Sequence, residues 1–371
     1  MSRLKVVQFL PKLDGGGVER GTLEIARALV NAGHESLVIS GGGQLVDQLQ
    51  REGSRHITWQ LGKKSPTALF KIRKVRNWLR LEKPDIVHVR SRMPAWVVWL
   101  AWRQMAPESR PRLVSTLHGL HSVSRYSEIM GCGERVIAVS NTAQQYLLDH
   151  YPRIDPGKIS VIYRGVDPNE FPAGYQPHSE WLAEWQQQFP QLANRFVICL
   201  PGRLTRLKGH QLLFDLIQNI NARGTKAVGL IVGGIDPNRK AYANSLFRER
   251  EQRGLQNDIV FTGFRSDMKN IFSISDVVLS LTTQPESFGR TALEALSMGT
   301  PLVGFQHGGV GEILSELYPA GRVQYGDSLG LQKKIELLIQ GKREPIQPNT
   351  IFALETMCTN TLTLYQELAG S

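Results

Sequence analysis

The chain has 371 residues, of which 41% are hydrophobic and 21% are charged, and this composition is sufficient for a large buried core. The length favours two domains. Cys132, Cys199 and Cys358 are far apart and form no CxxC, so we expect neither a disulfide framework nor a zinc site, and a reducing cytoplasm fits. No stretch approaches the ~18 apolar residues of a membrane-spanning helix, and the first residues lack the apolar run of a signal peptide.

The net charge of +11 is concentrated in one segment. Residues 63–112 carry thirteen Lys or Arg against three Asp or Glu, which indicates a basic patch and not a property of the whole surface. No recognised nucleic-acid-binding motif accompanies the patch, so nucleic acid is not expected as a partner.

Short apolar runs alternate with helical patterns through the first half of the chain. Residues 5–10 predict a strand, DGGG follows at 14–17, and residues 18–34 predict a helix that stops at Gly33. The next predicted strands lie at 36–40, 85–89, 112–118, 135–140 and 159–165. Short apolar strands separated by helices are typical of a parallel sheet that is covered on both faces.

A second series of the same kind follows a proline-rich stretch at 168–194, which we interpret as the interdomain region and which contains a short predicted helix. Strands are predicted at 195–203, 227–234, 258–264, 276–281 and 301–305, and the chain closes with a helical tail. The sequence therefore predicts two Rossmann-like α/β halves in tandem.

The glycine-rich turns argue against two common nucleotide-binding motifs. After Gly15 and Gly17, the third position of GxGxxG is Arg20, and the turn that begins at Gly41 fails in the same way. No GxxxxGK[ST] occurs. NAD and P-loop ATP chemistry are therefore disfavoured.

Two other strand-to-helix turns are more informative. PGRLTRLKG (201–209) presents Arg203 and Lys208 at a strand end, where they would suit a diphosphate or form an ordinary solvated basic loop. PESFGRTALEAL (285–296) predicts a helix with Ser287 as N-cap, whose first amides and dipole favour an anion. Glu286 stands just outside this helix, and Glu294 stands inside it among small and apolar residues, so we expect the buried carboxylate of Glu294 to have partners.

Segments over most of the chain resemble the retaining glycosyltransferases of family 4. These segments are GGGVERGTLEIARAL (15–29), STLHG (115–119), VIAVSN (136–141), VIYRGVD (161–167), PGRLTRLKG, FTGF (261–264) and PESFGRTALEALSMGTPLV (285–303). The resemblance implies an α/β fold of the GT-B type, with two facing Rossmann-like domains, an interdomain cleft and a C-terminal helix that crosses back to the first domain. We expect an acceptor-binding domain at 1–170 with the tail at about 351–371, and a donor-binding domain at 171–350.

By position, the resemblance assigns site residues. The implied catalytic residues are His118, Arg203, Lys208 and Glu286. The implied donor-binding residues are Gly16, Gly17, Gly263, Phe264, Phe288, Gly289, Arg290, Thr291 and Glu294. Glu286 would bind sugar hydroxyls, Glu294 the donor ribose, and Arg203 and Lys208 the diphosphate.

The remaining implied roles concern loops. His118 would lie near the reacting sugar, and Gly16 and Gly17 would close over the phosphates. The amides of residues 288–291 would assist at the diphosphate, and the backbone at 263–264 would border the nucleobase. Arg164 departs from the family pattern, because many members have Asn at this position.

The implied activity is transfer of a hexose from a nucleotide-sugar, with UDP as the expected nucleotide, to a glycan or glycolipid in bacterial lipopolysaccharide or surface-polysaccharide synthesis. No DxD occurs in the chain, so no metal is expected, and no cofactor is implied. The alternatives are a GT-B epimerase or phosphorylase and a non-catalytic sugar-nucleotide-binding module.

Three further histidines have separate interpretations. His88, inside the apolar run at 85–89, is best explained as a hydrogen-bonded core histidine. His210 either faces the site or caps a helix, and His307 has a weaker case for approaching the donor phosphates.

The basic patch contains two predicted amphipathic helices. Residues 71–83 place Ile72, Val75, Trp78 and Leu79 on one face, and residues 93–105 carry three Trp at three-residue spacing. They are either surface helices with a solvated basic side or a docking face for an anionic membrane or a phosphorylated glycolipid. The expected location is the cytoplasm, peripheral at the inner face of the plasma membrane.

Overall fold

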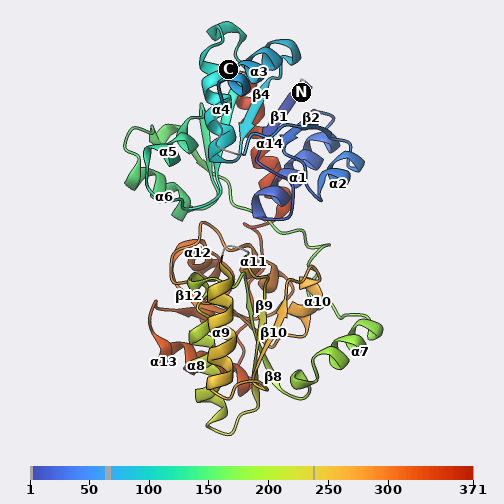
Figure 1. Cartoon of the computed structure of the whole chain (residues 1–371), viewed down its shortest axis with the longest axis vertical. Coiled ribbons are helices and arrows are strands. Elements are labelled where there is room, and N and C mark those ends of the chain that lie inside the picture. The colour runs from blue at the N-terminus through green and yellow to red at the C-terminus, as the bar shows by residue number, and fades with distance from the viewer. Residues whose placement is uncertain (1–2, 63–67, 237–238, 371) are drawn as a thin grey trace. The chain divides into compact units, whose positions relative to one another are not determined.

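The computed structural model describes residues 3–62, 68–236 and 239–370 (Figure 1). The chain divides into two compact units, and the first of them is discontinuous in sequence. Unit 1 comprises Met1–Gly165 and Ile351–Ser371, and unit 2 comprises Val166–Thr350. The division between the units therefore falls close to residue 170, where the sequence analysis placed the domain boundary.

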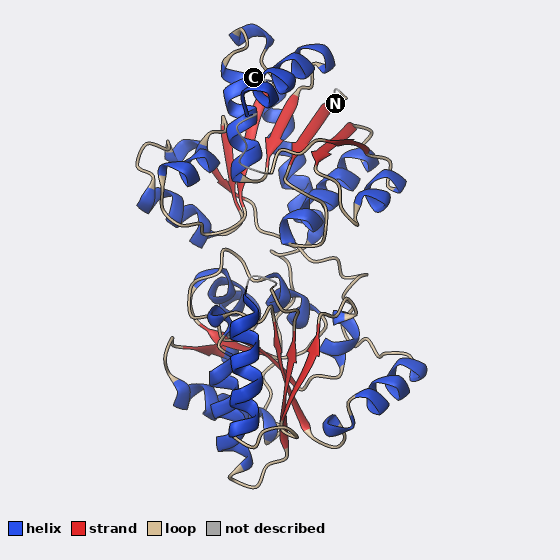
Figure 2. Ribbon diagram, viewed as in Figure 1, coloured by secondary structure: helices blue, strands red, loops and turns tan. Residues whose placement is uncertain are grey.

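Unit 1 is a parallel sheet of seven strands with helices on both faces (Figure 2). Its strands are β1 (Lys5–Phe9), β2 (Glu35–Ser40), β3 (Arg55–Thr58), β4 (Ile86–Val89), β5 (Arg112–Leu117), β6 (Arg135–Ala138) and β7 (Ile159–Val161). Its helices are α1 (Gly17–Asn31), α2 (Val46–Arg51), α3 (Ala68–Glu82), α4 (Arg92–Arg103), α5 (Arg125–Glu128), α6 (Asn141–His150) and α14 (Leu354–Gly370). The strand order is β3-β2-β1-β4-β5-β6-β7.

The core of unit 1 includes residues from both ends of the chain. Leu4 and Val6 of the N-terminal region pack in one cluster with Met357, Leu364 and the fully buried Tyr365 of α14. Helix α14 also contacts α1, as Figure 1 shows in red and blue. The last helix is therefore an integral part of the first unit, as the GT-B resemblance implied.

Unit 2 repeats the architecture with six parallel strands in the order β10-β9-β8-β11-β12-β13. Its strands are β8 (Phe196–Pro201), β9 (Ala227–Val232), β10 (Ile259–Gly263), β11 (Val277–Ser280), β12 (Leu302–Phe305) and β13 (Arg322–Val323). Its helices are α7 (Ser179–Gln188), α8 (His210–Asn221), α9 (Lys240–Gln252), α10 (Met268–Ser273), α11 (Arg290–Ser297), α12 (Gly308–Leu317) and α13 (Ser328–Ile339). A short 3₁₀ turn, η5 (Arg206–Lys208), precedes α8.

The two parallel α/β halves predicted from the sequence are confirmed, and two strands were missed. Strand β3 has only exposed and half-buried residues, and β13 has only two residues, so neither carries the continuous apolar run that marks a buried parallel strand. Within the described residues, no helix combines the length and the apolar content needed to cross a membrane.

Each sheet has one point at which its strand order reverses. In unit 1 the chain runs outward from β1 in one direction and from β4 in the other, and in unit 2 the reversal lies between β8 and β11. Loops that follow the neighbouring strands diverge there, and the crevice that opens at their carboxyl ends is where open α/β sheets bind ligands. The glycine-rich loop follows β1, Lys208 follows β8 and Glu286 follows β11.

Candidate active site

The loop after β8 presents Lys208 through a glycine-dependent turn. Lys208 ends η5, and Gly209 after it has φ +72°. A Cβ on Gly209 would lie 2.4 Å from the carbonyl oxygen of Leu281, so only glycine lets this turn pack against the end of β11. Gly202 lies under the Lys208 side chain, and Arg203 is exposed.

Lys208 contacts Glu286, which lies in the loop after the neighbouring strand β11. Because β8 pairs with β11, the loops after these strands lie side by side, and the amide of Thr283 donates to the carbonyl of Leu207 at 2.9 Å. The Lys208 ammonium donates a hydrogen bond to the Glu286 carboxylate, and both side chains are about one quarter exposed. The structure therefore brings two of the four implied catalytic residues into contact within unit 2.

Helix α11 begins later than the sequence suggested. The predicted N-cap at Ser287 is wrong: the helix starts at Arg290, and its N-cap is Gly289 at φ +115°. A Cβ on Gly289 would lie 2.5 Å from Cγ2 of Val310. Only glycine combines this left-handed conformation with such close packing, and hence it fixes where the helix starts.

The segment from Phe288 to Thr291 directly precedes and opens α11, so its amides belong to the positive end of the helix. Phe288 is buried, and its backbone packs closely on Gly309 at the start of α12. The amide of Gly309 donates to the carbonyl of Glu286 at 2.8 Å. The starts of α11 and α12 therefore fix the backbone that carries Glu286.

Glu294 is 4% exposed, and its carboxylate accepts a hydrogen bond from Nε of Arg290 at 2.9 Å. The prediction that this buried acid has a partner is confirmed. The partner is one helical turn earlier on α11, at the i, i+4 spacing at which side chains meet.

The remaining predicted residues of unit 2 lie at other positions along the same edge. Gly263 ends β10 with φ +75°, and Phe264 after it is 79% exposed. His307 directly precedes α12, and its Nε2 lies 2.9 Å from the carbonyl oxygen of Thr282. His210 opens α8 and is 1% exposed; its burial, and then the charge of Lys208, lower its pKa to about 4.

In unit 1, the glycine-rich loop after β1 leads directly into α1. Gly16 is the N-cap, and Gly17 is the first residue of the helix. A Cβ on Gly15 or Gly17 would meet nothing within 4 Å, whereas one on Gly16 would meet the flexible Glu19 side chain. This loop is therefore open on the side where its side chains would be.

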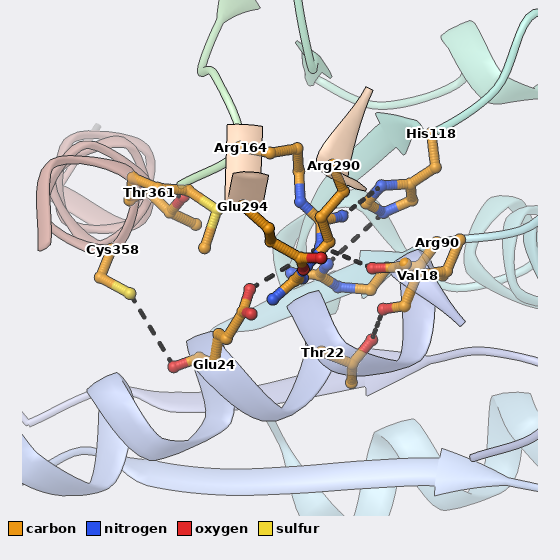
Figure 3. Close-up of polar contacts among 12 residues, drawn as sticks. Val18, Thr22, Glu24, Arg90, His118, Arg164, Arg290, Glu294, Cys358 and Thr361 are labelled. Carbon is orange, nitrogen blue, oxygen red and sulfur yellow. Dashed lines mark hydrogen bonds and ion pairs between the residues drawn. The ribbon is translucent and has the colours of Figure 1, made fainter. Parts of the chain in front are cut away.

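His118 follows β5 and lies between two arginines (Figure 3). Nη1 of Arg164 lies 3.2 Å from its Nδ1, and Nη1 of Arg90 lies 3.4 Å from its Nε2. The arginines are 7% and 5% exposed. Desolvation, then the charges of Arg164 and Arg90, hold the pKa of His118 well below its usual range, so the ring is neutral at pH 7.

A chain of buried hydrogen bonds lies behind this site. The Tyr365 hydroxyl of α14 is 2.6 Å from Nδ1 of His88, and Nε2 of His88 is 2.6 Å from Oγ1 of Thr116. The charge of Arg90 lies close enough to Tyr365 to oppose the rise that burial causes in the pKa of its phenol. The interpretation of His88 as a hydrogen-bonded core histidine is confirmed, and burial holds its pKa well below the usual range.

A small cavity adjoins these residues, with a volume of about 20 Å³. It is lined by His88, Arg90, Thr116, His118 and Arg164 from the sheet side, and by Met357 and Thr361 of α14. A cavity of this size, with polar groups in its wall, has room for about one water molecule.

Three residues around His118 were not predicted from the sequence as site residues, namely Glu24, Arg90 and Tyr365. The prediction that Arg90 belongs to the basic surface patch is wrong, because its side chain is buried beside His118. Its position directly after an apolar strand was the available signal. Lys63 and Lys64 of that patch lie outside the described residues.

Within the described part of the chain, no group of three or more His, Cys, Asp or Glu side chains is arranged to hold a metal ion. The clustered charges at the two sheet edges are instead cationic or paired, as with Lys208 and Glu286.

Comparison with solved structures identifies the fold of this chain. The structure matches a glycosyltransferase from Rickettsia africae with a TM-score of 0.86 and 29% identity, covering 99% of each chain. It also matches HepE of Anabaena, solved with UDP and glucose, with a TM-score of 0.81 and 22% identity, covering 98% of this chain and 100% of that one. The fold is that of the GT-B glycosyltransferases, as predicted.

The family follows from the sequence. Residues 15–170 match the model of Glycosyltransferase Family 4, and residues 183–349 match that of Glycosyl transferases group 1. The chain belongs to glycosyltransferase family 4. The undecaprenol-diphosphate α-1,3-galactosyltransferase of Escherichia coli is 27% identical over 81% of this chain and 79% of its own length. Among the other curated relatives, a glycosyltransferase of Methanocaldococcus jannaschii is matched over 79% of its length, whereas three others are matched over only 40% to 59% of theirs.

Proposed function

We propose that this glycosyltransferase moves a hexose from a UDP-sugar to a glycan or glycolipid acceptor, with retention of anomeric configuration and without a metal ion. The observation that carries the proposal is the contact between Lys208 and Glu286 at the strand-order reversal of unit 2, beside the start of α11. HepE was solved with UDP-glucose, and the name of the E. coli galactosyltransferase specifies a UDP-sugar donor and a lipid-diphosphate acceptor.

In the proposed site, a bound donor takes over the contacts of the Lys208–Glu286 pair. The ammonium of Lys208, the guanidinium of Arg203 and the N-terminal amides of α11 bind the diphosphate. Glu286 then accepts hydrogen bonds from sugar hydroxyls, and Glu294 accepts them from the ribose while Arg290 holds its carboxylate. Gly263 and Phe264 border the uracil, and Gly16 and Gly17 close over the phosphates.

The proposed chemistry needs no covalent enzyme intermediate. The bond between the anomeric carbon and the diphosphate oxygen breaks, the acceptor oxygen bonds to that carbon on the same face, and the acceptor proton passes to a phosphate oxygen. Negative charge develops on the leaving UDP, and in this proposal Lys208 and the helix amides stabilise that charge. His118, neutral at pH 7, donates a hydrogen bond to the reacting sugar.

The test is a transfer assay with radiolabelled UDP-, GDP- and ADP-sugars and a panel of polyprenyl-diphosphate-linked sugars. We expect transfer from UDP-sugars, a product with the donor's anomeric configuration, and unchanged turnover in EDTA. Isomerisation of the donor without an acceptor would indicate an epimerase, and binding without turnover would indicate a non-catalytic module. Either result would contradict the proposal.

We also propose that unit 1 docks on an anionic membrane from the cytoplasmic side to reach a lipid-linked acceptor in lipopolysaccharide or surface-polysaccharide synthesis. On α3, Ile72, Val75 and Leu79 are buried as predicted, but Phe70 is 77% and Leu81 is 82% exposed beside the basic residues of the helix. Exposed apolar side chains next to basic ones suit an interfacial helix.

Liposome co-sedimentation tests the membrane proposal. The wild type should pellet with vesicles that contain anionic lipid and should be released at high salt. Leu81→Ser and Phe70→Ser should reduce pelleting, whereas Leu329→Ser, which changes an equally exposed leucine in unit 2, should not. Equal pelleting with neutral and anionic vesicles would exclude the electrostatic part of the proposal.

A further inference from the structure

Arg164 stands where many members of the resembled family have Asn, and it is 7% exposed just after the carboxyl end of β7. Its Nη1 contacts Nδ1 of His118 at 3.2 Å, and its Nη2 donates to the carbonyl of Gly17 at 2.5 Å. Nη2 also lies 3.7 Å from the carboxylate of Glu24. One planar guanidinium therefore connects His118 to the first residue of the helix that follows the glycine-rich loop (Figure 3).

A glycine inside α1 makes room for this guanidinium. A Cβ on Gly21 would lie 2.3 Å from Nη2 and 2.6 Å from Cζ of Arg164. Glycine within a helix costs about 0.5–1 kcal/mol relative to alanine, so its presence here needs a reason. The space occupied by Arg164 supplies that reason, and Gly21 and Arg164 form a matched pair.

The two arginines make different demands on the His118 ring. A guanidinium can only donate, and a neutral imidazole has one accepting nitrogen and one N–H. Only one of the two contacts can therefore be a hydrogen bond. The 3.2 Å contact from Arg164 to Nδ1 lies within the usual range, whereas the 3.4 Å contact from Arg90 to Nε2 lies beyond it.

From this geometry we infer that Arg164 is a positioning residue that fixes the tautomer of His118, so that Nδ1 accepts and Nε2 carries the proton. His118 then presents an N–H donor on its Nε2 side, in an orientation that is tied to Gly17 through the same guanidinium. The catalytic consequence rests on the proposed function, in which His118 donates to the sugar. The tautomer itself does not, because it can be measured without any donor or acceptor.

The direct test is NMR of the full chain with ¹⁵N-labelled histidine, where the His118 signals are assigned among the nine histidines by comparison with His118→Gln. We expect His118 of the wild type to be protonated at Nε2 and bare at Nδ1. Arg164→Asn should give a mixture of tautomers, whereas Arg90→Gln, which removes the other guanidinium, should leave the proton on Nε2. A proton on Nδ1 in the wild type, or no change in Arg164→Asn, would overturn the inference.

Gly21→Ala gives an independent test that leaves Arg164 in the chain. The added methyl should displace the guanidinium, mix the His118 tautomers and lower kcat by on the order of 10²-fold with little change in the KM for the donor. In the Arg164→Asn background, Gly21→Ala should not lower kcat any further, because the guanidinium that the added methyl would displace is absent. An equal cost in both backgrounds would show that Gly21 serves only the helix.

If the tautomer responds as expected and no variant, nor the wild type, transfers sugar, the proposed function fails while the positioning role of Arg164 stands. If sugar transfer occurs and the tautomer of His118 does not respond, the positioning role of Arg164 fails while the proposed function stands.

Discussion

The two units share an architecture but hold their candidate site residues in different ways. In unit 1, Arg90 and Arg164 contact His118, Arg164 also pairs with Glu24, and His88, which bonds Tyr365 of α14, lines the same cavity. In unit 2, Lys208 and Glu286 are partly exposed, bond each other, and are carried by turns that depend on glycine. Unit 1 is thus organised by a buried polar network, and unit 2 by its backbone.

This difference suggests a division of roles. A buried network in which every donor has a fixed direction keeps a side chain in one orientation. A partly exposed ion pair on a rigid backbone is stable without ligand and can exchange its partner for a charged ligand at little cost, because such pairs contribute only about 0–1 kcal/mol. Unit 1 is suited to orientation, and unit 2 to capture of an anion.

The largest effect should come from breaking the pair in unit 2. Lys208→Ala and Glu286→Ala should each lower kcat by about 10²-fold or more, because each removes a charged contact that strengthens in the transition state. Arg223→Ala is the control, since it breaks an exposed pair with Glu336 in the same unit and should leave turnover unchanged. Near-normal sugar transfer by both site variants would contradict the assignment of the site.

A methyl at Gly309 tests the claim that the backbone organises unit 2. Its Cβ would lie 2.3 Å from Cα of Phe288, so Gly309→Ala should destabilise the protein by about 1–3 kcal/mol and displace Glu286. Gly15→Ala in the open loop of unit 1 has nothing within 4 Å and should be neutral in urea unfolding. Equal stability of the two variants would remove the contrast between the units.

Acid should weaken unit 2 through His210. Its pKa is lowered to about 4 in the folded state, so below about pH 6.5 the unfolded chain binds the proton first and stability falls as the pH falls. Between pH 7 and pH 5 this group alone should cost about 2 kcal/mol. Urea midpoints of His210→Gln should depend less on pH than those of the wild type. An unchanged pH dependence would count against His210 as the cause.

The smallest effect should come from removing the Tyr365 hydroxyl in unit 1. Tyr365→Phe leaves Nδ1 of His88 without its hydroxyl partner and should cost about 1–2 kcal/mol in urea unfolding. Ser54→Ala removes a buried hydroxyl bond to Ser36 elsewhere in the same unit and should cost about 1 kcal/mol or less. Only Tyr365→Phe should also lower kcat. A loss of stability without a loss of kcat would limit this network to folding.

The parts of the fold that could be predicted were those set by local pattern. Buried parallel strands carry continuous apolar runs, so eleven of the thirteen strands in the described residues were recognised, whereas the edge strands β3 and β13 carry no such run. The start of α11 was missed because it depends on Val310, which is distant in sequence and packs against Gly289.

The candidate site also has a part that could be predicted from the sequence and a part that depends on residues distant in the chain. The convergence of Lys208 and Glu286 could be expected from the resemblance and from the rule that strand ends share an edge. The network around His118 could not, because it joins residues as far apart as His88 and Tyr365, which are 277 positions distant. Nothing in the local sequence around Arg90 or Arg164 indicates that both would be buried against one imidazole.

Unit 1 is completed by a segment that the ribosome makes only after unit 2. The strands of unit 1 are synthesised first, but α14, which supplies Tyr365 and one wall of the cavity, follows only after all of unit 2. Domains fold in the order of synthesis when they are continuous. Here unit 2 has all of its own residues available first, while His88 of unit 1 still lacks the phenol of Tyr365. The acquisition of activity should therefore coincide with the docking of the final helix.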